Sequence, residues 1–285
     1  MTDADSRPRL SRHDKLIEEI RSSLSRQANF PTCLDDALRV RDALEQEQLS
    51  LEDLGDVIAR SPLIAARILR LANTAAYNPA GKPVCDLHTA ISRVGFAAVR
   101  AVSLAIAIAQ MQAPKQPAAF TGIARQALSH SIEVAAIART LARRLGCCNP
   151  EEALLAGLVH DIGIFYLLYR ATGHPDYERD PALLDDLLLQ EHEATGEQLL
   201  QALGLPARII LAVRDHERLE HVEAPSSIRD LLYFANLLAI PCEEESPSHY
   251  PDDERTLREL DRKRFEPLLQ ASEADIADLR SALAA

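Results

Sequence analysis

The chain has 285 residues, enough for one large domain or two of ordinary size, and 47% of them are hydrophobic while 26% are charged. With only ten glycines and many leucines and alanines, this composition predicts a helix-rich protein and argues against an all-β or disordered chain. The formal net charge of -12, without a long block of Lys and Arg, argues against extended contact with nucleic acid or an anionic membrane surface.

The N-terminus, residues 1–13, lacks the apolar core of a signal peptide and is expected to be flexible. No stretch approaches the roughly 20 apolar residues that a membrane helix needs, which predicts a cytoplasmic protein. The five cysteines are an odd number without a Cys-x-x-Cys spacing. They are therefore expected to be reduced packing residues, not a disulfide framework or a zinc knuckle.

Residues 14–112 have the pattern of short amphipathic helices that form a first bundle. A capping box begins at Ser50, and Ser61 before a proline predicts a second helix start. That helix is expected to end near Tyr77. Gly95 then divides a further pair of helices.

The second helix of this pair ends in the almost uncharged run VSLAIAIAQ, residues 102–110. Such a run is either a docking surface for a partner or a surface buried between the two halves of the chain. Uncovered apolar patches are rare in monomers, which favours burial.

The segment APKQP, residues 113–117, carries two prolines in five positions and marks the best domain boundary in the chain. Residues 118–285 are expected to form a second helical bundle with a helical tail. The pattern predicts a helix over 125–145, four more helices over 150–240, and a last short helix capped by Ser272. The predicted fold class is therefore all-α, with two packed helical bundles.

The run EEALLAGLVHDIGIFYLLYR, residues 151–170, places His160 and Asp161 side by side in an apolar helical pattern. Adjacent residues of a continuous helix point about 100 degrees apart, so one metal ion reaches both only where the helix ends or bends. We expect Gly163 to supply that ending.

Three further histidines, His130, His192 and His216, each lie on the apolar stripe of their own predicted helix. Histidines that point inward from four helices can meet in one pocket, although each alone is also explained as a core histidine with one hydrogen-bond partner. Imidazole and carboxylate suit iron, manganese, zinc or magnesium. A bound divalent ion would activate water for attack on a phosphate. The other histidines fall in polar or loop contexts and are expected at the surface.

The blocks SPLIAARILRLANTAAYN, LHTAISRVGFAAVRAVSLAIA and SHSIEVAAIARTLA, the last followed by AGLVHDIG, together resemble the HDOD domain family from about residue 30 to 240. The resemblance implies an all-helical relative of the HD metal-dependent phosphohydrolases, with an HD-like second bundle. In the catalytic HD superfamily a first histidine, the His-Asp pair and a later aspartate hold the metal. The first three correspond to His130, His160 and Asp161. Asn236 stands where the later aspartate is expected.

His192 and His216 resemble the extra histidines of the HD-GYP branch, which cleaves cyclic dinucleotides, and are expected to line the same pocket. However, Ile164 stands where that branch has the lysine of its HDIGK motif, and no Gly-Tyr-Pro motif follows His216. An amide oxygen is a weaker ligand than a carboxylate, and the loss of a supporting residue alone typically lowers metal affinity or activity by about 10- to 100-fold. These departures predict a remnant metal site with residual binding and without turnover.

The resemblance implies a non-catalytic bacterial regulatory module that acts through signalling proteins, in motility, attachment or cyclic-di-GMP signalling, and that is a candidate homodimer. A first alternative is a metal-dependent phosphohydrolase of a nucleotide or cyclic dinucleotide that uses the same metal ligands. A second is a sensor that holds a nucleotide without cleaving it. Arg139, Arg143 and Arg144 would then face phosphates, unless they simply form a solvated face.

Overall fold

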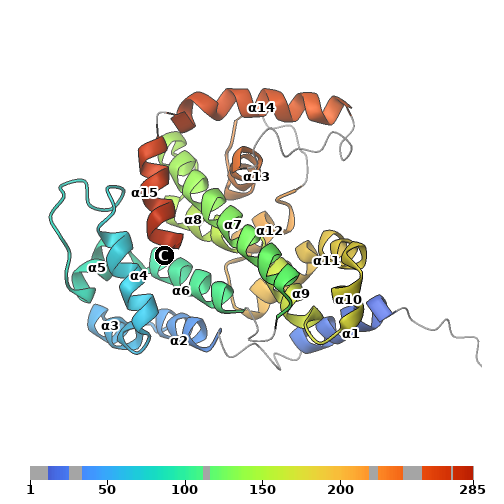
Figure 1. Ribbon diagram of the computed structural model, residues 1–285. Helices are drawn as coiled ribbons and strands as arrows, with labels where there is room; N and C mark the ends of the chain where they lie inside the picture. The colour runs from blue at the N-terminus through green and yellow to red at the C-terminus, as the bar shows by residue number, and fades with distance from the viewer. Residues whose placement is uncertain are drawn as a thin grey trace, which may run out of the picture.

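The protein is all-helical throughout the part of the chain that the computed structural model describes, which comprises residues 12–25, 34–111, 116–217, 224–239, 252–270 and 272–284 (Figure 1). The prediction of an all-α fold is confirmed. In chain order the helices are α1 (Arg12–Ser25), α2 (Asp35–Leu44), α3 (Leu51–Ala59), α4 (Pro62–Ala72), α5 (Leu87–Val94), α6 (Phe96–Gln110), α7 (Ala118–Leu145), α8 (Pro150–Val159), α9 (Ile162–Ala171), α10 (Pro175–Arg179), α11 (Pro181–Ala202), α12 (Ala207–Arg214), α13 (Ile228–Ala239), α14 (Asp252–Gln270) and α15 (Glu273–Ala284).

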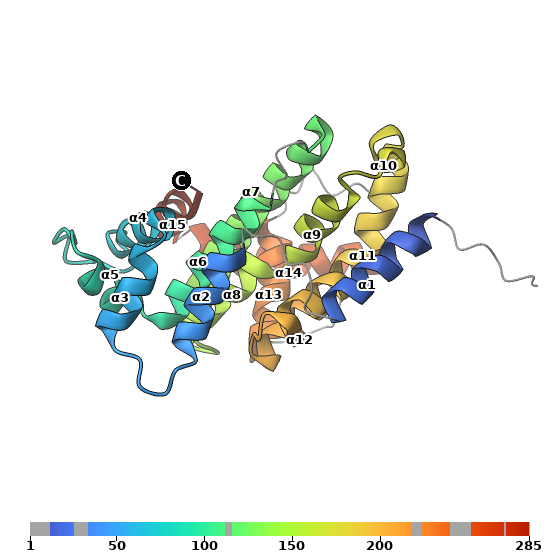
Figure 2. The same ribbon diagram turned by 90° about the horizontal axis from the view of Figure 1, so that it is seen from below.

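Helix α7 is the central element of the fold, and its 28 residues span about 42 Å. Helices α8 and α13 pack along it, while α2 to α6 lie on one side and α9 to α12 on the other (Figure 1). Helix α1 lies against α9 and α11, away from the helices that follow it in sequence (Figure 2). The division into bundles at residues 113–117 stays a prediction. Residues 116 and 117, which the structure describes, are not helical.

Several helix ends follow from local sequence signals. The Ser50 side chain accepts a hydrogen bond from the Asp53 backbone N–H at 3.0 Å, and this capping box starts α3 as predicted. Gly95 adopts φ 83° and divides α5 from α6, whose axes differ by 105°. Gly146, in the left-handed conformation with φ 67°, ends α7. Positive φ at both glycines is accessible because they lack a Cβ atom.

Three other helix boundaries differ at least in part from what the sequence predicted. Helix α4 ends at Ala72, five residues before Tyr77, because the side chain of Asn73 bonds the carbonyls of Leu69 and Val84, each at 2.8 Å, and turns the chain. Helix α4 begins at Pro62 directly after Ser61, as predicted, although the Ser61 side chain makes no capping hydrogen bond. Helix α15 likewise begins directly after Ser272, as predicted, but the buried Ser272 hydroxyl has no hydrogen-bond partner among the described residues.

Residues 150–240 hold six helices in their described part, α8 to α13, where four were expected. Helices α8, α10 and α11 each begin at a proline, which favours the first helical turn and ends the segment before it. The run Pro150–Ala171 is long and apolar enough to cross a membrane, contrary to our expectation that no such run exists. It is divided into α8 and α9, and 83% of its most apolar window is buried in protein.

The run VSLAIAIAQ lies in α6 and is mostly buried. Helix α6 packs against α2, α4, α5 and α8, so this run is an internal packing surface rather than a docking surface. Its buried members are Val102, Ser103, Leu104, Ile106, Ala107 and Ile108. Burial on nearly every face explains why the run carries no charge.

A buried polar cluster joins the loop after α4 to helices α7 and α8. The Arg139 side chain is only 5% exposed, and its Nε donates to Glu151 Oε1 at 3.0 Å and to Tyr77 Oη at 3.1 Å. The guanidinium also lies 4.0 Å from the centre of the Tyr77 ring, and the Tyr77 hydroxyl donates to Glu151. Burial raises the pKa of Tyr77, so it stays a protonated donor.

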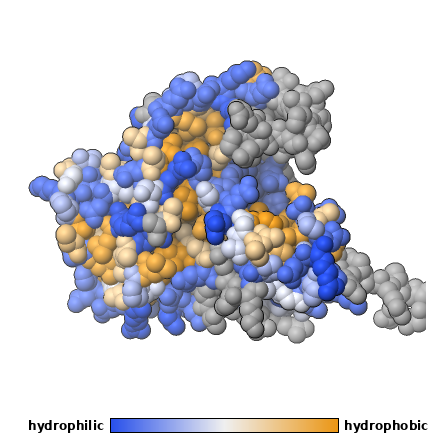
Figure 3. Space-filling view, in the orientation of Figure 1, coloured by the Kyte–Doolittle hydropathy of each residue, from blue (hydrophilic) through white to orange (hydrophobic). Residues whose placement is uncertain are grey.

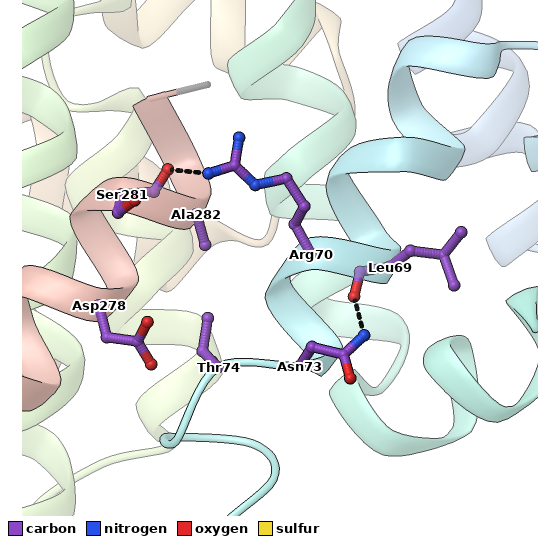
Figure 4. A pocket seen from close by; sticks show the side chains of 7 residues that line it. All are labelled: Leu69, Arg70, Asn73, Thr74, Asp278, Ser281 and Ala282. Carbon is purple, nitrogen blue, oxygen red and sulfur yellow. Dashed lines mark hydrogen bonds between the residues drawn. The ribbon is translucent and has the colours of Figure 1, made fainter. Parts of the chain in front are cut away.

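Helix α15 brings the C-terminal end of the described chain back to α4 and α7. Arg70 donates to the Ser281 carbonyl at 2.9 Å, and the Asp278 carboxylate accepts from the Ala75 backbone N–H at 2.6 Å. A pocket of about 360 Å³ lies between α4 and α15 and is lined by both helices (Figure 4). Before α15, helix α14 runs along the top of the molecule, and its described side chains, residues 259–270, give it a largely hydrophilic outer face (Figure 3).

Replacing Arg139 by methionine should strongly lower the free energy of unfolding, because it leaves the mostly buried Glu151 carboxylate without its cation. Breaking a buried ion pair from one side costs about 3–5 kcal/mol. Arg143→Met, on the exposed face of the same helix, is the matched control and should change stability by no more than about 0.5 kcal/mol. Urea unfolding of both variants provides the measurement, and equal effects would contradict a stabilising role for the cluster.

Candidate metal centre

The His160–Asp161 pair lies at a break between two helices. Helix α8 ends at Val159 and α9 begins at Ile162. His160 still has helical dihedral angles, but Asp161 has φ -98° and ψ 19° and leaves the helical path. The expected break is therefore present, and it lets both side chains face one site.

Gly163 does not supply this break, because it lies inside the first turn of α9. Its role is to let the backbone of α9 come close to that of α11. A Cβ atom at Gly163 would lie 2.0 Å from the carbonyl oxygen of His192 and 2.9 Å from the backbone nitrogen of Gly196. The glycine thus allows the backbones of α9 and α11 to touch, and this contact brings His192 to the His-Asp pair.

Four histidines from different parts of the chain meet at this break. The rings of His130 on α7 and His160 have their centres 5.2 Å apart, and His160 lies 5.0 Å from His216 at the end of α12. His192 on α11 lies 5.6 Å from His216. His160, His192 and His216 are buried, as is Asp161, so the apolar-stripe placement of these histidines correctly predicted that they point inward.

Three of these histidines are held in the same way. The Nδ1 atom of His160 lies 2.9 Å from the Gly157 carbonyl, that of His192 lies 2.8 Å from the Leu188 carbonyl, and that of His216 lies 2.6 Å from the Val213 carbonyl. A carbonyl only accepts, so each Nδ1 carries the hydrogen and donates it.

The opposite nitrogen, Nε2, of all three rings is buried and without a hydrogen-bond partner among the described residues. Metal-binding histidines typically donate one ring nitrogen to a carbonyl or carboxylate and offer the other to the ion. Without a metal ion, a buried nitrogen of this kind has no partner to replace the hydrogen bonds that it would make with water. The geometry is thus that of metal ligands.

The Asp161 carboxylate lies among these nitrogens. Its Oδ2 is 3.1 Å from His160 Nε2, and its Oδ1 is 3.5 Å from His216 Nε2. Burial alone raises the pKa of Asp161, but the electrostatic interaction with His160 and His216 outweighs it and holds the pKa well below its usual range. The site therefore contains an ionised carboxylate, which attracts a cation.

Glu217 adds a second carboxylate at the edge of the site. Its Oε1 lies 3.5 Å from His192 Nε2 and 3.9 Å from His216 Nε2, and its side chain is 54% exposed. Burial lowers the pKa of His192, but the interaction with Glu217 and the charge of Asp161 raise it to about 9. The two carboxylates thus make this edge the cation-attracting side of the centre.

His130 differs from the other three histidines. Its Nε2 lies 2.8 Å from Oδ1 of Asn236 on α13, and the amide oxygen only accepts, so His130 donates this nitrogen's hydrogen. Desolvation lowers the pKa of His130, which favours the neutral ring. Asn236 therefore points toward His130, as the sequence predicted, and its amide oxygen accepts from one of the two ring nitrogens of His130.

A pocket of about 650 Å³ opens onto this centre, with His130 and Asp161 in its lining. Ile164, which replaces the expected lysine, also lines it, so this wall is apolar. The cation in the lining is Arg280 of α15, which forms an ion pair with Glu133 at 2.5 Å. The remaining lining residues are Ile123, Gln126, Ala127, Ser129 and Ala239.

The arginines expected to face phosphates are elsewhere. Arg139 is buried in its ion pair with Glu151, while Arg143 and Arg144 are exposed at the far end of α7 and do not line the pocket. Sequence reasoning missed Arg280, because only tertiary packing brings α15 to α7. It also missed Glu217, although its position next to His216 was a signal. Of the histidines expected at the surface, His88 and His174 are exposed, while the side chains of His13, His221 and His249 lie outside the described part of the structure.

The residues present fit a divalent metal ion. Two groups whose ligand atoms all lie within 4.8 Å of one another share Asp161: one adds His130 and His160, the other His192 and His216. Imidazole nitrogens and carboxylates bind iron, manganese and zinc. An ion held here would act as a Lewis acid toward water or a phosphate oxygen in the adjoining pocket.

The family model described as HDOD domain matches residues 30–219. A protein from Shewanella amazonensis SB2B, provisionally assigned as a metal-dependent phosphohydrolase, is 21% identical with a TM-score of 0.76, covering 96% of this chain and 100% of its own. An HDOD domain protein with unknown function from Geobacter sulfurreducens is 23% identical with a TM-score of 0.61, covering 94% and 96%. A provisionally assigned signal transduction protein from Marinobacter aquaeolei VT8 is 21% identical with a TM-score of 0.58, covering 97% and 67%. These likenesses show the fold. A search of the curated proteins found no match.

The contact at Gly163 predicts a strong effect of adding one methyl group. Gly163→Ala should lower the free energy of unfolding by about 3 kcal/mol, the upper end of the usual cost of overpacking, because the new Cβ meets backbone atoms that cannot rotate away. Gly122→Ala on α7, where a Cβ has nothing within 4 Å, is the matched control and should raise stability by up to about 1 kcal/mol. Thermal and urea unfolding of both variants measure the difference. A tolerated alanine at 163 would contradict the close approach of α9 and α11.

Proposed function

Because the chain belongs to the HDOD domain family, we propose that it is a non-catalytic signalling module whose output passes through protein partners. The observation that carries the non-catalytic part is the hydrogen bond between His130 and Asn236. A neutral amide stands where a hydrolytic centre needs a charged oxygen ligand, and it engages the histidine that would share the metal.

The pocket supports the same proposal. Ile164 contributes an apolar wall beside Asp161, so no lysine there offsets the charge of a phosphate. Arg280 does face the pocket, but its ion pair with Glu133 already balances its charge. A negatively charged phosphoester in this pocket would therefore be repelled by the ionised Asp161, and little positive charge in the pocket wall would offset that repulsion.

The output proposed here is association with other signalling proteins, in motility, attachment or cyclic-di-GMP signalling, with self-association as a homodimer included. A pull-down from the native cell identifies the partner, and sedimentation of the purified chain reports the dimer. Partner binding that survives Asp161→Asn would show that the site serves structure, whereas loss of binding on metal removal would make the site the input of the module.

A second candidate function is metal-dependent phosphohydrolysis. The observation in its favour is the set of three buried Nε2 atoms around an ionised Asp161, beside a pocket of about 650 Å³. The same pocket supports a third candidate, a sensor that holds a nucleotide without cleaving it, in which Arg280, and not Arg139, Arg143 or Arg144, would face the phosphates. Thermal shift with cyclic dinucleotides tests that candidate.

Purified protein should hydrolyse neither bis(p-nitrophenyl) phosphate nor cyclic di-GMP faster than a variant that carries both His160→Ala and Asp161→Ala, with manganese or iron supplied. The physical reason is the missing carboxylate at position 236 and the missing cation at position 164. Robust turnover that disappears in the double variant would replace the signalling proposal by the enzymatic one.

Asn236→Asp should raise the affinity for Mn²⁺ by at least about tenfold, because it adds a charged oxygen beside His130 without a change in side-chain volume. The metal-free variant should lose stability, since the new carboxylate and Asp161 repel each other. Asn236→Ala, which removes the amide without adding charge, is the control and should not raise the affinity. Calorimetric titration and thermal unfolding measure both effects, and an unchanged affinity together with unchanged stability would contradict this placement of residue 236.

A further inference from the structure

We infer that the groove between α4 and α7, which α15 fills in the structure, is a docking site for the C-terminal end of a helix from a partner protein, and that α15 is a detachable strap that competes with this partner. The proposed partner helix has the chemistry of α15, with apolar side chains at the spacing of Ile276, Leu279 and Leu283 and unpaired carbonyls in its last turn. The inference rests on the proposed function for the existence of a partner, and it adds the surface and the kind of segment that binds there.

Two arginines of α4 bind the last turn of α15. Arg70 donates to the Ser281 carbonyl at 2.9 Å, as Figure 4 shows, and Arg67 donates to the Leu283 carbonyl. The last four carbonyls of an α-helix have no partner within the helix and carry partial negative charge, so positive side chains stabilise them. Neither arginine forms an ion pair with a carboxylate among the described residues. This pair of positive charges on α4 is therefore complementary to the C-terminus of a helix.

Charged side chains of α15 fix its position along the groove. The Asp278 carboxylate accepts from the Ala75 backbone N–H at 2.6 Å, just beyond the end of α4. On the other side, Arg280 forms an ion pair with Glu133 of α7 at 2.5 Å. The groove thus offers a backbone donor on one wall and a carboxylate on the other, and a helix from a partner would bind there with an acidic and a basic side chain two residues apart.

Few large side chains attach α15 to the rest of the molecule. Its large buried side chains are those of Ile276, Leu279 and Leu283. Pockets of about 360 Å³ on the α4 side and about 450 Å³ on the α7 side flank the helix, whereas a core helix is closely packed on all sides. A helix of 12 residues is also too short to be stable by itself in water. We therefore expect α15 to leave the groove as one unit while α4 and α7 stay folded.

The chain before α15 permits this movement. Pro267 lies inside α14, and because proline has no backbone N–H, it removes one hydrogen bond near the end of that helix. Release of α15 would uncover Leu128 and Ile132 of α7, which line the pocket on that side. A second copy of the chain keeps its own α15 docked and so offers no free helix end. This favours a different protein as the occupant of the groove.

Hydrogen exchange of the full chain, measured by mass spectrometry, tests the strap without any variant. The backbone amides of α15 should exchange at least about 100-fold faster than those of residues 134–141 in α7, because α15 opens locally and the centre of α7 opens only with the whole core. Equal protection of the two segments would overturn the inference.

A fluorescent peptide with the sequence of residues 272–285 and a C-terminal amide tests the groove by fluorescence anisotropy. Leu279→Ala in the full chain weakens the strap and leaves the groove intact, so this variant should bind the peptide at least about tenfold more tightly than wild type does. Leu260→Ala on α14, where the side chain is exposed, is the matched control and should leave the affinity unchanged. Adding Arg67→Met and Arg70→Met to Leu279→Ala should lower the affinity at least about tenfold, because the groove loses its positive charges.

A peptide that binds Leu279→Ala no more tightly than wild type would also overturn the inference. If wild type sediments as a dimer and Leu279→Ala as a monomer, a second copy is the occupant, and the assignment of the groove to a different protein is wrong. None of these measurements involves hydrolysis, so detection of turnover would contradict the proposed function and leave the strap and its groove standing.

Discussion

An ionised carboxylate buried in a helical protein, Asp161, is the constraint on which the rest of the site depends. Burial of an isolated charge is very unfavourable, so such a group requires cations or hydrogen-bond donors around it. Here three buried histidines surround Asp161. Each is in turn fixed through Nδ1 by a backbone carbonyl. The helical backbone thus sets the orientation of the three imidazole rings.

Two glycines make this convergence sterically feasible. A Cβ at Gly163 would lie 2.0 Å from the His192 carbonyl, and one at Gly157 would lie 2.5 Å from the Cα atom of Ala135. Gly163 therefore brings α11 to α9, while Gly157 brings α8 to α7. Gly157 also supplies the carbonyl that accepts from His160. The same close packing that forms the hydrophobic core sets the distances among the histidines, so changes in packing and in metal affinity should be coupled.

The site is also connected physically to the first half of the chain. The Arg139–Glu151–Tyr77 cluster fixes the loop after α4 to α7 and α8, the helices that position His130 and His160. Helix α15 contacts α4 on one side and places Arg280 at the pocket on the other. A change at the site that moves α7 or α15 would therefore reach the α4 side through rigid contacts. This is the arrangement that a signalling module needs, and a hydrolase could also contain it.

Local patterns in the sequence determined the all-helical class and the inward direction of the histidines, because helical periodicity fixes which face of a helix is buried. The family resemblance predicted that Asn236 lies beside His130, and the 2.8 Å hydrogen bond between His130 Nε2 and Asn236 Oδ1 agrees with that prediction. Only the tertiary structure decided that Arg139 is buried, that Arg280 lines the pocket and that Nε2 is the free nitrogen of three rings. These features depend on distances between helices far apart in sequence, and such distances are set by side-chain packing, which residue spacing within one helix does not encode.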